Sequence, residues 1–256
     1  MKIRFVNLDD AFYTLGFFAR TIRGIGNFVL RGGAAYKVLT LQILFTFVEA
    51  LGIASLLALG IGAAVYVIGM PLLLNLSQPR LIYSLLIIII TRELGPLLAA
   101  FIIIARSATA IATEIGGMVI SHEVEAYIAV GVDPIEYLAV PRFLGVTVSM
   151  FLLNIYFSVF GLAGSYGVVR IFNPLPAEYY FSSLFQALTI HDISISIIKS
   201  ICFGMIIAVL AISNGFSVER ASTEIPIVGL KSVGSSFAWC IIVDILLSAL
   251  YYTALS

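Results

Sequence analysis

Long apolar stretches are the feature that most constrains the fold of this chain. They cover residues 39–70, 81–113, 143–169, 193–214 and 232–255. Each is at least as long as the roughly 20 residues that a helix needs to cross a bilayer. They are continuous, whereas the strands of an outer-membrane barrel alternate apolar and polar residues. The pattern predicts an all-α integral membrane protein whose five transmembrane helices form one domain over residues 1–256.

The composition indicates the same class of protein. Hydrophobic residues make up 61% of the chain and charged residues 11%, against about 25% charged residues in a soluble domain. Too few polar side chains remain to cover a water-facing surface. The net charge is zero, so the chain lacks the excess of positive charge that is typical of nucleic-acid-binding proteins. Cys202 and Cys240 lie within apolar runs, where packing is the expected role of a thiol.

The distribution of lysine and arginine predicts the orientation in the membrane. With a cytoplasmic N-terminus, the cytoplasmic side holds nine of these residues and the outer loops hold two, Arg80 and Arg170. Basic residues are enriched on the cytoplasmic side of membrane proteins. We therefore expect a cytoplasmic N-terminus and, after five spans, a C-terminus on the outer side. Residues 1–10 carry charges of both signs and no short apolar core, so no removable signal peptide is expected.

Three segments outside the spans have patterns of their own. Residues 11–31 place basic residues between apolar positions at helical spacing, which predicts an amphipathic helix in the membrane interface, with a plain linker helix as the alternative. Residues 114–142 form the longest polar insertion, expected on the cytoplasmic side. It should hold a short helix between Gly116-Gly117 and the turn Gly131-Val132-Asp133-Pro134. Residues 170–191 are expected to form an outer loop with tyrosines at headgroup level.

Two adjacent charges, Arg92 and Glu93, interrupt the second apolar stretch. A charge inside a span is costly and indicates a functional site. Neighbouring residues on a helix point about 100° apart, so we expect the two side chains not to face each other. Pro96 lacks an N–H, which leaves the carbonyl of Arg92 without its helical hydrogen bond. The candidate partners for these charges in the other spans are Glu49, Asp192, Lys199 and Asp244.

Two interpretations of this polar stretch remain open. In the first, it is a kinked section of a substrate path, and Arg92 neutralises a phosphate headgroup while apolar walls accept acyl chains. In the second, it is a structural ion-pair network that holds helices together. The two can overlap. The residues assigned to the substrate path are Arg92, Glu93, Pro96, Asp244 and Glu49.

Several catalytic and nucleotide-binding motifs are absent from the sequence. No G-x-x-x-x-G-K-[ST] occurs, so binding of ATP by a P-loop in this chain is excluded. No G-x-S-x-G or H-E-x-x-H occurs either, and we expect no enzymatic activity in this chain. His122, Glu123 and Glu125 lack metal-ligand spacing. The two halves show no internal repeat, which disfavours an inverted-repeat carrier.

Motifs in the second and third apolar stretches resemble one known family. Several segments are similar to the signature of the MlaE (YrbE) permeases. They are residues 92–96 (Arg-Glu-Leu-Gly-Pro), residues 105–116, and the Gly131-Val132-Asp133-Pro134 turn followed by Tyr137-Leu138 and Pro141-Arg142. These are membrane subunits of ABC transporters that move lipids between bacterial inner and outer membranes. The resemblance implies an interfacial helix followed by five spans in the inner membrane.

The same resemblance implies an assembly. It comprises a permease homodimer, two ATPase subunits that bind ATP and Mg²⁺, and an outer partner with an Mce domain. A lipid cavity would lie at the dimer interface, lined by the first, second and fifth spans. The 114–142 segment would couple to the ATPase through Glu114, Gly116, His122, Glu123, Glu125, Gly131, Asp133 and Pro134.

Two other functions are alternatives. One is an ion-coupled carrier that uses Glu93, Lys199 and Asp244 as a relay. The other is a membrane scaffold that anchors other subunits without transporting anything. No cofactor is expected in this chain.

Overall fold

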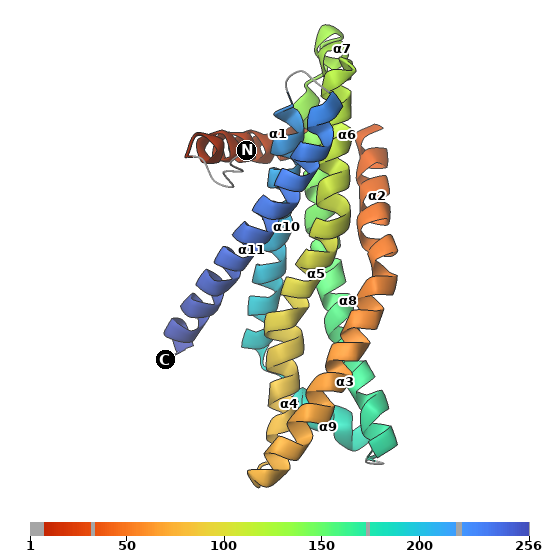
Figure 1. Cartoon of the computed structure of the whole chain (residues 1–256), viewed down its shortest axis with the longest axis vertical. Helices are drawn as coiled ribbons and strands as arrows, with labels where there is room; N and C mark the ends of the chain where they lie inside the picture. The colour runs from red at the N-terminus through yellow and green to blue at the C-terminus, as the bar shows by residue number, and fades with distance from the viewer. Residues whose placement is uncertain (1–7, 32–33, 173–174, 219–221, 256) are drawn as a thin grey trace.

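The molecule is an elongated bundle of helices (Figure 1). The computed structural model describes residues 8–31, 34–172, 175–218 and 222–255. Within these ranges the regular structure is helical, and none of the described residues belongs to a strand. Five of the helices are long and apolar enough to cross a membrane: Tyr36–Asn75, Leu81–Ile120, Ile135–Ile171, Ile190–Phe216 and Ile225–Thr253. The predicted all-α class with five spans is confirmed.

The first span is built from α2 (Ala34–Phe47), the short η1 (Val48–Ala50) and α3 (Leu51–Asn75). Small residues on α3 lie buried against α8 (Val140–Phe172). A Cβ added at Gly62 would lie 2.1 Å from the carbonyl oxygen of Gly161. Backbone contact of this kind is what small residues permit between membrane helices.

The second span contains five consecutive helical segments. They are α4 (Leu81–Leu86), the π-helical η2 (Ile87–Leu94), α5 (Gly95–Ile103), the π-helical η3 (Ile104–Ala108) and α6 (Thr109–Ile120). Single π turns inside helices often mark functional sites. Arg92 lies in the first π segment and Arg106 in the second. Pro96 follows the first π segment within α5, where its missing N–H fits the interruption in the regular α-helical hydrogen bonds.

The third span begins with the π-helical η4 (Ile135–Ala139) and continues as α8. It packs against the fourth span, α10 (Ile190–Phe216), in the middle of the core. The core contains buried side chains from both helices, among them Phe157 and Phe203. The fifth span is α11 (Ile225–Leu255), which follows the short η5 (Ser222–Glu224). Figure 1 shows α11 diverging from the bundle toward its C-terminal end.

The spans extend beyond the ranges expected from hydropathy. The third span starts at Ile135 rather than residue 143, and the second continues to Ile120 rather than residue 113. Polar residues such as Glu114 and Glu136 therefore belong to the helices. The polarity of the sequence placed these residues in the insertion, because polar side chains indicate exposure to water. A helix can continue through exposed residues, however, as long as its backbone hydrogen bonds continue. The insertion that remains outside the spans contains α7 (Glu123–Ala129).

The first helix, α1 (Leu8–Arg31), runs across the long axis of the bundle (Figure 1). It lies near the same end of the molecule as α7. Phe17, Thr21 and Phe28 are buried, and a Cβ at Gly24 would lie 2.9 Å from Val140. The predicted helix is present, and its crosswise course suits an interfacial location, which stays a prediction.

The segment between the third and fourth spans, which was expected to be an outer loop, contains a helix. This helix, α9 (Ala177–Ala187), follows Pro176. Tyr180 is buried, and its hydroxyl lies 2.6 Å from that of Ser165 on α8. Burial raises the pKa of Tyr180 to about 12. The prolines suggested a loop, but the apolar spacing of Tyr180 and Leu184 allows this short helix to pack on the bundle.

Candidate functional site

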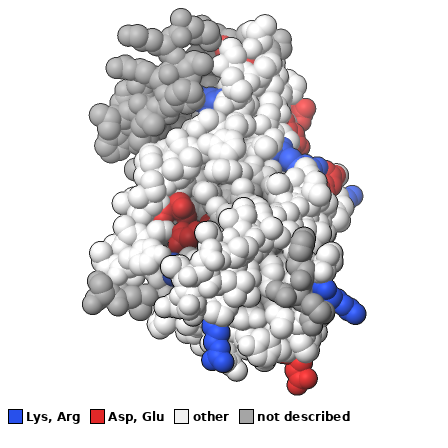
Figure 2. Space-filling model, turned by 60° about the horizontal axis from the view of Figure 1, so that its bottom comes forward, with Lys and Arg blue, Asp and Glu red and all other residues white. Residues whose placement is uncertain are grey.

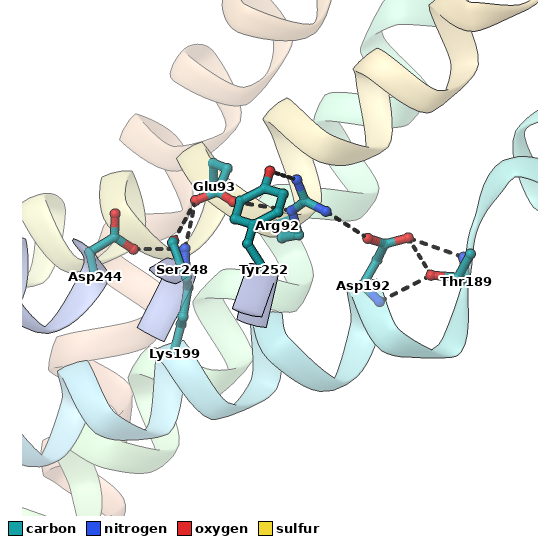
Figure 3. Close-up of polar contacts among 8 residues, drawn as sticks. All are labelled: Arg92, Glu93, Thr189, Asp192, Lys199, Asp244, Ser248 and Tyr252. Carbon is teal, nitrogen blue, oxygen red and sulfur yellow. Dashed lines mark hydrogen bonds and ion pairs between the residues drawn. The ribbon is translucent and has the colours of Figure 1, made fainter. Parts of the chain in front are cut away.

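A network of five charged side chains joins three of the spans (Figure 3). Arg92 and Glu93 belong to η2 in the second span. Asp192 and Lys199 belong to α10. Asp244 belongs to α11. The network therefore contains three of the four expected partners of Arg92 and Glu93, namely Asp192, Lys199 and Asp244.

Lys199 is at the centre of one half of the network. Its Nζ lies 2.7 Å from Oε2 of Glu93 and 2.9 Å from Oδ1 of Asp244. The lysine side chain has no exposed surface. A fully buried ammonium is stable only when it is paired, because its desolvation costs several kcal/mol. The two carboxylates from the second and fifth spans supply that pairing.

Arg92 holds the other half of the network. Its Nε donates a hydrogen bond to Oε1 of Glu93 at 3.1 Å, and its Nη1 lies 3.5 Å from Oδ1 of Asp192. Its Nη2 donates to the hydroxyl of Tyr252. The guanidinium carbon lies 5.1 Å and 5.0 Å from the ring centres of Tyr251 and Tyr252, which is cation–π distance. Arg92 is therefore engaged by acceptors and by two aromatic rings.

The contact between Arg92 and Glu93 corrects one expectation from the sequence. The 100° separation on an α-helix suggested that these neighbours cannot face each other, yet they form an ion pair. The separation describes where the Cβ atoms point, and long side chains can bend back toward each other beyond that atom. The backbone here is also π-helical rather than α-helical, so the α-helical angle does not apply.

Asp192 also caps the start of α10. Its Oδ2 accepts hydrogen bonds from the backbone N–H of Thr189 at 3.2 Å and from the Thr189 hydroxyl at 2.6 Å. In return, the N–H of Asp192 donates to the Thr189 hydroxyl at 3.3 Å. This reciprocal capping box satisfies donors that the first helical turn leaves free. The position of Arg92 is thus linked to the N-terminal end of α10.

Residues on α11 complete the network but were missed in the sequence. The hydroxyl of Ser248 donates to Oε2 of Glu93 at 3.1 Å, and Tyr252 contacts Arg92. Ser248 and Tyr252 follow Asp244 by four and eight residues, so all three lie on one face of the helix. That spacing was the signal that could have identified them.

Glu49 lies outside the network. It forms an ion pair with Arg106 in η3, and the two side chains are 48% and 35% exposed. The expectation that Glu49 partners Arg92 is therefore wrong. Glu49 and Arg92 occupy different levels of the bundle because Arg106 comes 14 residues after Arg92 along the same span, about 21 Å at 1.5 Å per residue.

The predicted coupling residues lie at the opposite end of the second span. Glu114 binds Arg142, whose Nη2 is 2.8 Å from Oε1 of Glu114 and whose Nη1 donates to the carbonyl of Leu138. Arg142 is buried and connects α6 with the start of α8. Gly116 lies inside α6, where an added Cβ would be 3.0 Å from Cγ2 of Val218, so it does not bracket α7 as expected.

The remaining coupling residues surround α7. His122 precedes α7 with a φ of 59°, and its Nδ1 lies 3.0 Å from Oε2 of Glu125. Glu123 accepts a hydrogen bond from the Ser121 hydroxyl at 3.0 Å. After α7, Gly131 has a φ of 78°, a conformation that favours glycine. Asp133 accepts a hydrogen bond from the N–H of Ile135 at 2.8 Å, and Pro134 is the N-cap residue that precedes the third span.

The described part of the chain shows no group of three or more His, Cys, Asp or Glu side chains that could hold a metal ion. The charged side chains of the network instead form ion pairs with one another. Five membrane-length helices with ion pairs between them define a multi-pass integral membrane protein, and paired charges inside such spans mark substrate pathways or helix contacts.

Comparison with known proteins gives the family. The model of the MlaE permease family matches residues 39–250, and the chain belongs to that family. It is therefore an ABC transporter permease, a class of subunit that implies an ATPase partner.

The relatives agree with this assignment. A probable ABC transporter permease protein of Rickettsia typhi is 32% identical over 158 residues, which span 58% of this chain and 60% of that protein. One from Rickettsia bellii is 26% identical over 227 residues, or 88% of this chain and 86% of that protein. The chloroplastic protein Trigalactosyldiacylglycerol 1 of Arabidopsis thaliana is 25% identical over 224 residues, which span 88% of this chain and 64% of that protein.

Proposed function

We propose that this chain is the permease subunit of an ABC transporter that moves phospholipid, or a related lipid, between the inner and outer membranes of a bacterium. The observation that carries the proposal is the charge network of Arg92, Glu93, Lys199 and Asp244 inside the apolar spans. One helical span, Leu81–Ile120, joins this network to the segment around α7, which we propose couples to the ATPase on the cytoplasmic side. A polar site among apolar helices suits a ligand with a polar head and acyl chains.

The name of one relative supports a lipid substrate. The chloroplastic relative from Arabidopsis thaliana is named after trigalactosyldiacylglycerol, which is a lipid. The match covers 88% of this chain, so it includes most of the membrane domain. The inference from that name to the substrate of this chain is part of the proposal.

The proposed assembly is a homodimer with two ATPase subunits and an outer partner that carries an Mce domain. The chain would be a multi-pass protein of the inner membrane with a cytoplasmic N-terminus. It needs no cofactor of its own, since ATP and Mg²⁺ would be bound by the ATPase. Force from the ATPase would enter through α7 and its flanking turns.

The contacts near α7 suit such a transfer of movement. Arg142 links Glu114 on α6 to the start of α8. A displacement of α7 would thus be shared by the second and third spans. At the far end of the second span, the ion pairs of Glu93 and Arg92 with α10 and α11 would have to rearrange. That rearrangement would open or close a lipid site beside the network.

The test is co-purification of the chain with the products of its neighbouring genes, followed by lipid transfer in proteoliposomes. We expect an ATPase to co-purify and ATP hydrolysis to drive movement of labelled phospholipid. The Arg92→Leu, Glu93→Gln double variant should keep the complex and lose transfer. Transfer by the isolated chain under a proton gradient alone would support an ion-coupled carrier instead. Undiminished activity of the double variant would support a scaffold.

A further inference from the structure

The accessible part of the charge network is acidic. The side chains of Glu93 and Asp244 are 30% and 18% exposed, whereas those of Lys199 and Arg92 are 0% and 7% exposed. Figure 2 shows one recessed group of acidic atoms among mostly uncharged residues, with basic atoms close to it. A ligand that approaches the network therefore meets carboxylates, with the two cations behind them.

The network also has no surplus positive charge. It contains the two cations Arg92 and Lys199 and the three carboxylates of Glu93, Asp192 and Asp244. Asp192 is stabilised in part by the capping box at the start of α10, where the helix dipole favours a negative charge. Without Asp192 the remaining four charges balance. Whether Asp192 is counted or not, the network has no net positive charge that could attract a phosphate.

The donors of Arg92 are already directed at protein acceptors. They face Glu93, Asp192 and the hydroxyl of Tyr252, and the tyrosine rings lie against the guanidinium. The expectation that Arg92 neutralises a phosphate headgroup would require several of these contacts to break. The exposed carboxylates instead favour a ligand group that is positively charged.

Asp244 offers an acceptor for such a group. Its Oδ1 faces Lys199, and Figure 3 shows the other carboxylate oxygen directed away from the network. Oδ1 is buried and has only this ion-pair contact, with no hydrogen bond, and no hydrogen bond or ion pair among the described residues involves Oδ2. An ammonium group has three N–H donors, and its hydrogen bonds to carboxylates are among the strongest in proteins.

We propose that the acidic face formed by Glu93 and Asp244 binds the ammonium of an amine-bearing phospholipid headgroup. This inference rests on the proposed function, because it names the lipid class for the same site. The lipid origin follows from the surroundings on α11. Ile241, Ile245 and Leu246 flank Asp244 along the chain and are exposed, so an amine attached to acyl chains can be held at both its polar and apolar parts.

The experiment measures headgroup preference at constant acyl chains. The complex of this chain with its ATPase is reconstituted into vesicles of equal parts phosphatidylethanolamine and phosphatidylglycerol, both with palmitoyl and oleoyl chains. The lipid that remains bound after re-extraction is quantified by mass spectrometry. We expect about tenfold enrichment of phosphatidylethanolamine, the effect of one charge-assisted hydrogen bond.

Variants connect the preference to the carboxylates. Asp244→Asn should reduce the enrichment to nearly one, and Asp244→Glu should restore most of it. Glu178→Gln on α9 removes an exposed carboxylate elsewhere on the outer side and should leave the enrichment unchanged. All variants are compared only in fractions that co-elute with the ATPase, so that a failure to assemble is not counted as a loss of preference.

The outcomes separate this inference from the proposed function. Bound lipid in the proportions of the vesicle, with wild-type protein, would overturn the inference and leave lipid transport intact. Enrichment that persists in both Asp244→Asn and Glu93→Gln would also overturn it. If Glu93 and Asp244 bind only protons and no lipid amine, the wild-type protein would hold lipid in the proportions of the vesicle. If ATP moves no lipid of either headgroup, the proposed function itself fails.

Discussion

The second span carries two arginines in two π-helical segments, and their surroundings differ. Arg92 in η2 is buried and shared among Glu93, Asp192 and the tyrosines of α11. Arg106 in η3 forms a single pair with Glu49, and both side chains are partly exposed. One arginine thus belongs to a network across three spans, and the other connects two spans at an accessible surface.

The difference shows that burial, more than the presence of an ion pair, decides what a charge does in this protein. A buried charge that loses its partner is left in a medium that solvates it poorly, so its partners are held in place. A pair that faces water gains little, because water solvates both charges and the side chains lose entropy when they pair. The network is therefore expected to control helix positions, whereas the Glu49–Arg106 pair is not.

Replacing Lys199 by methionine should have the largest effect. The substitution preserves the shape of the side chain and leaves Glu93 and Asp244 facing each other without the central cation. Breaking a buried pair in this way costs about 3–5 kcal/mol. The measurement is the thermal unfolding of the detergent-purified protein.

A triple variant separates lost charge from lost packing. Glu93→Gln, Lys199→Met and Asp244→Leu together remove all three charges, and a well-packed uncharged replacement is often close to neutral. We expect the triple variant to recover most of the stability that Lys199→Met loses. If both variants are equally unstable, the network is not held by its charges, and the comparison with the Glu49–Arg106 pair fails.

The same substitution at both arginines gives an intermediate effect. Lysine keeps the charge but has neither the planar fork nor the stacking surface of arginine. Arg92→Lys should cost about 1.5–3 kcal/mol because it loses a charge-assisted hydrogen bond among several contacts. Arg106→Lys should stay within about 0.5 kcal/mol, as for most exposed positions. Equal losses in the unfolding assay would contradict the distinction between the two sites.

Removal of the exposed pair should have the smallest effect. Glu49→Gln with Arg106→Gln eliminates both charges and leaves polar side chains in their place. The expected loss is below about 1 kcal/mol, measured by the same thermal unfolding. A larger loss in the assembled complex than in the isolated chain would show that a partner covers this pair and makes it behave like the network.

Much of this arrangement could be predicted from the sequence. Apolar length alone identified five spans, and the cost of intramembrane charge singled out Arg92, Glu93, Lys199, Asp192 and Asp244 as mutual partners. These predictions succeed because burial of apolar surface and pairing of charge are strong energetic requirements. They depend on residue type more than on detailed geometry.

The rest depended on geometry that residue types do not specify. Glu49 was assigned to the network because both lie in spans, but its level along the bundle is set by how α2 and α3 pack on their neighbours. The contact of Arg92 with Glu93 depended on side-chain conformation and a π-helical backbone. The helix α9 was hidden because the prolines before it are also typical of loops.

The capping box at Thr189 and Asp192 has a consequence for solution measurements. One carboxylate serves both the guanidinium of Arg92 and the first turn of α10. The N–H groups of Asp192 and Ile193 bond to the carbonyl of Thr189 in that turn. When Arg92 changes partners, the fraying of the turn should change with it, and so should the rate of amide hydrogen exchange there. The first turn of α10 thus reports, through its amide exchange and without an attached probe, whether a ligand occupies the network.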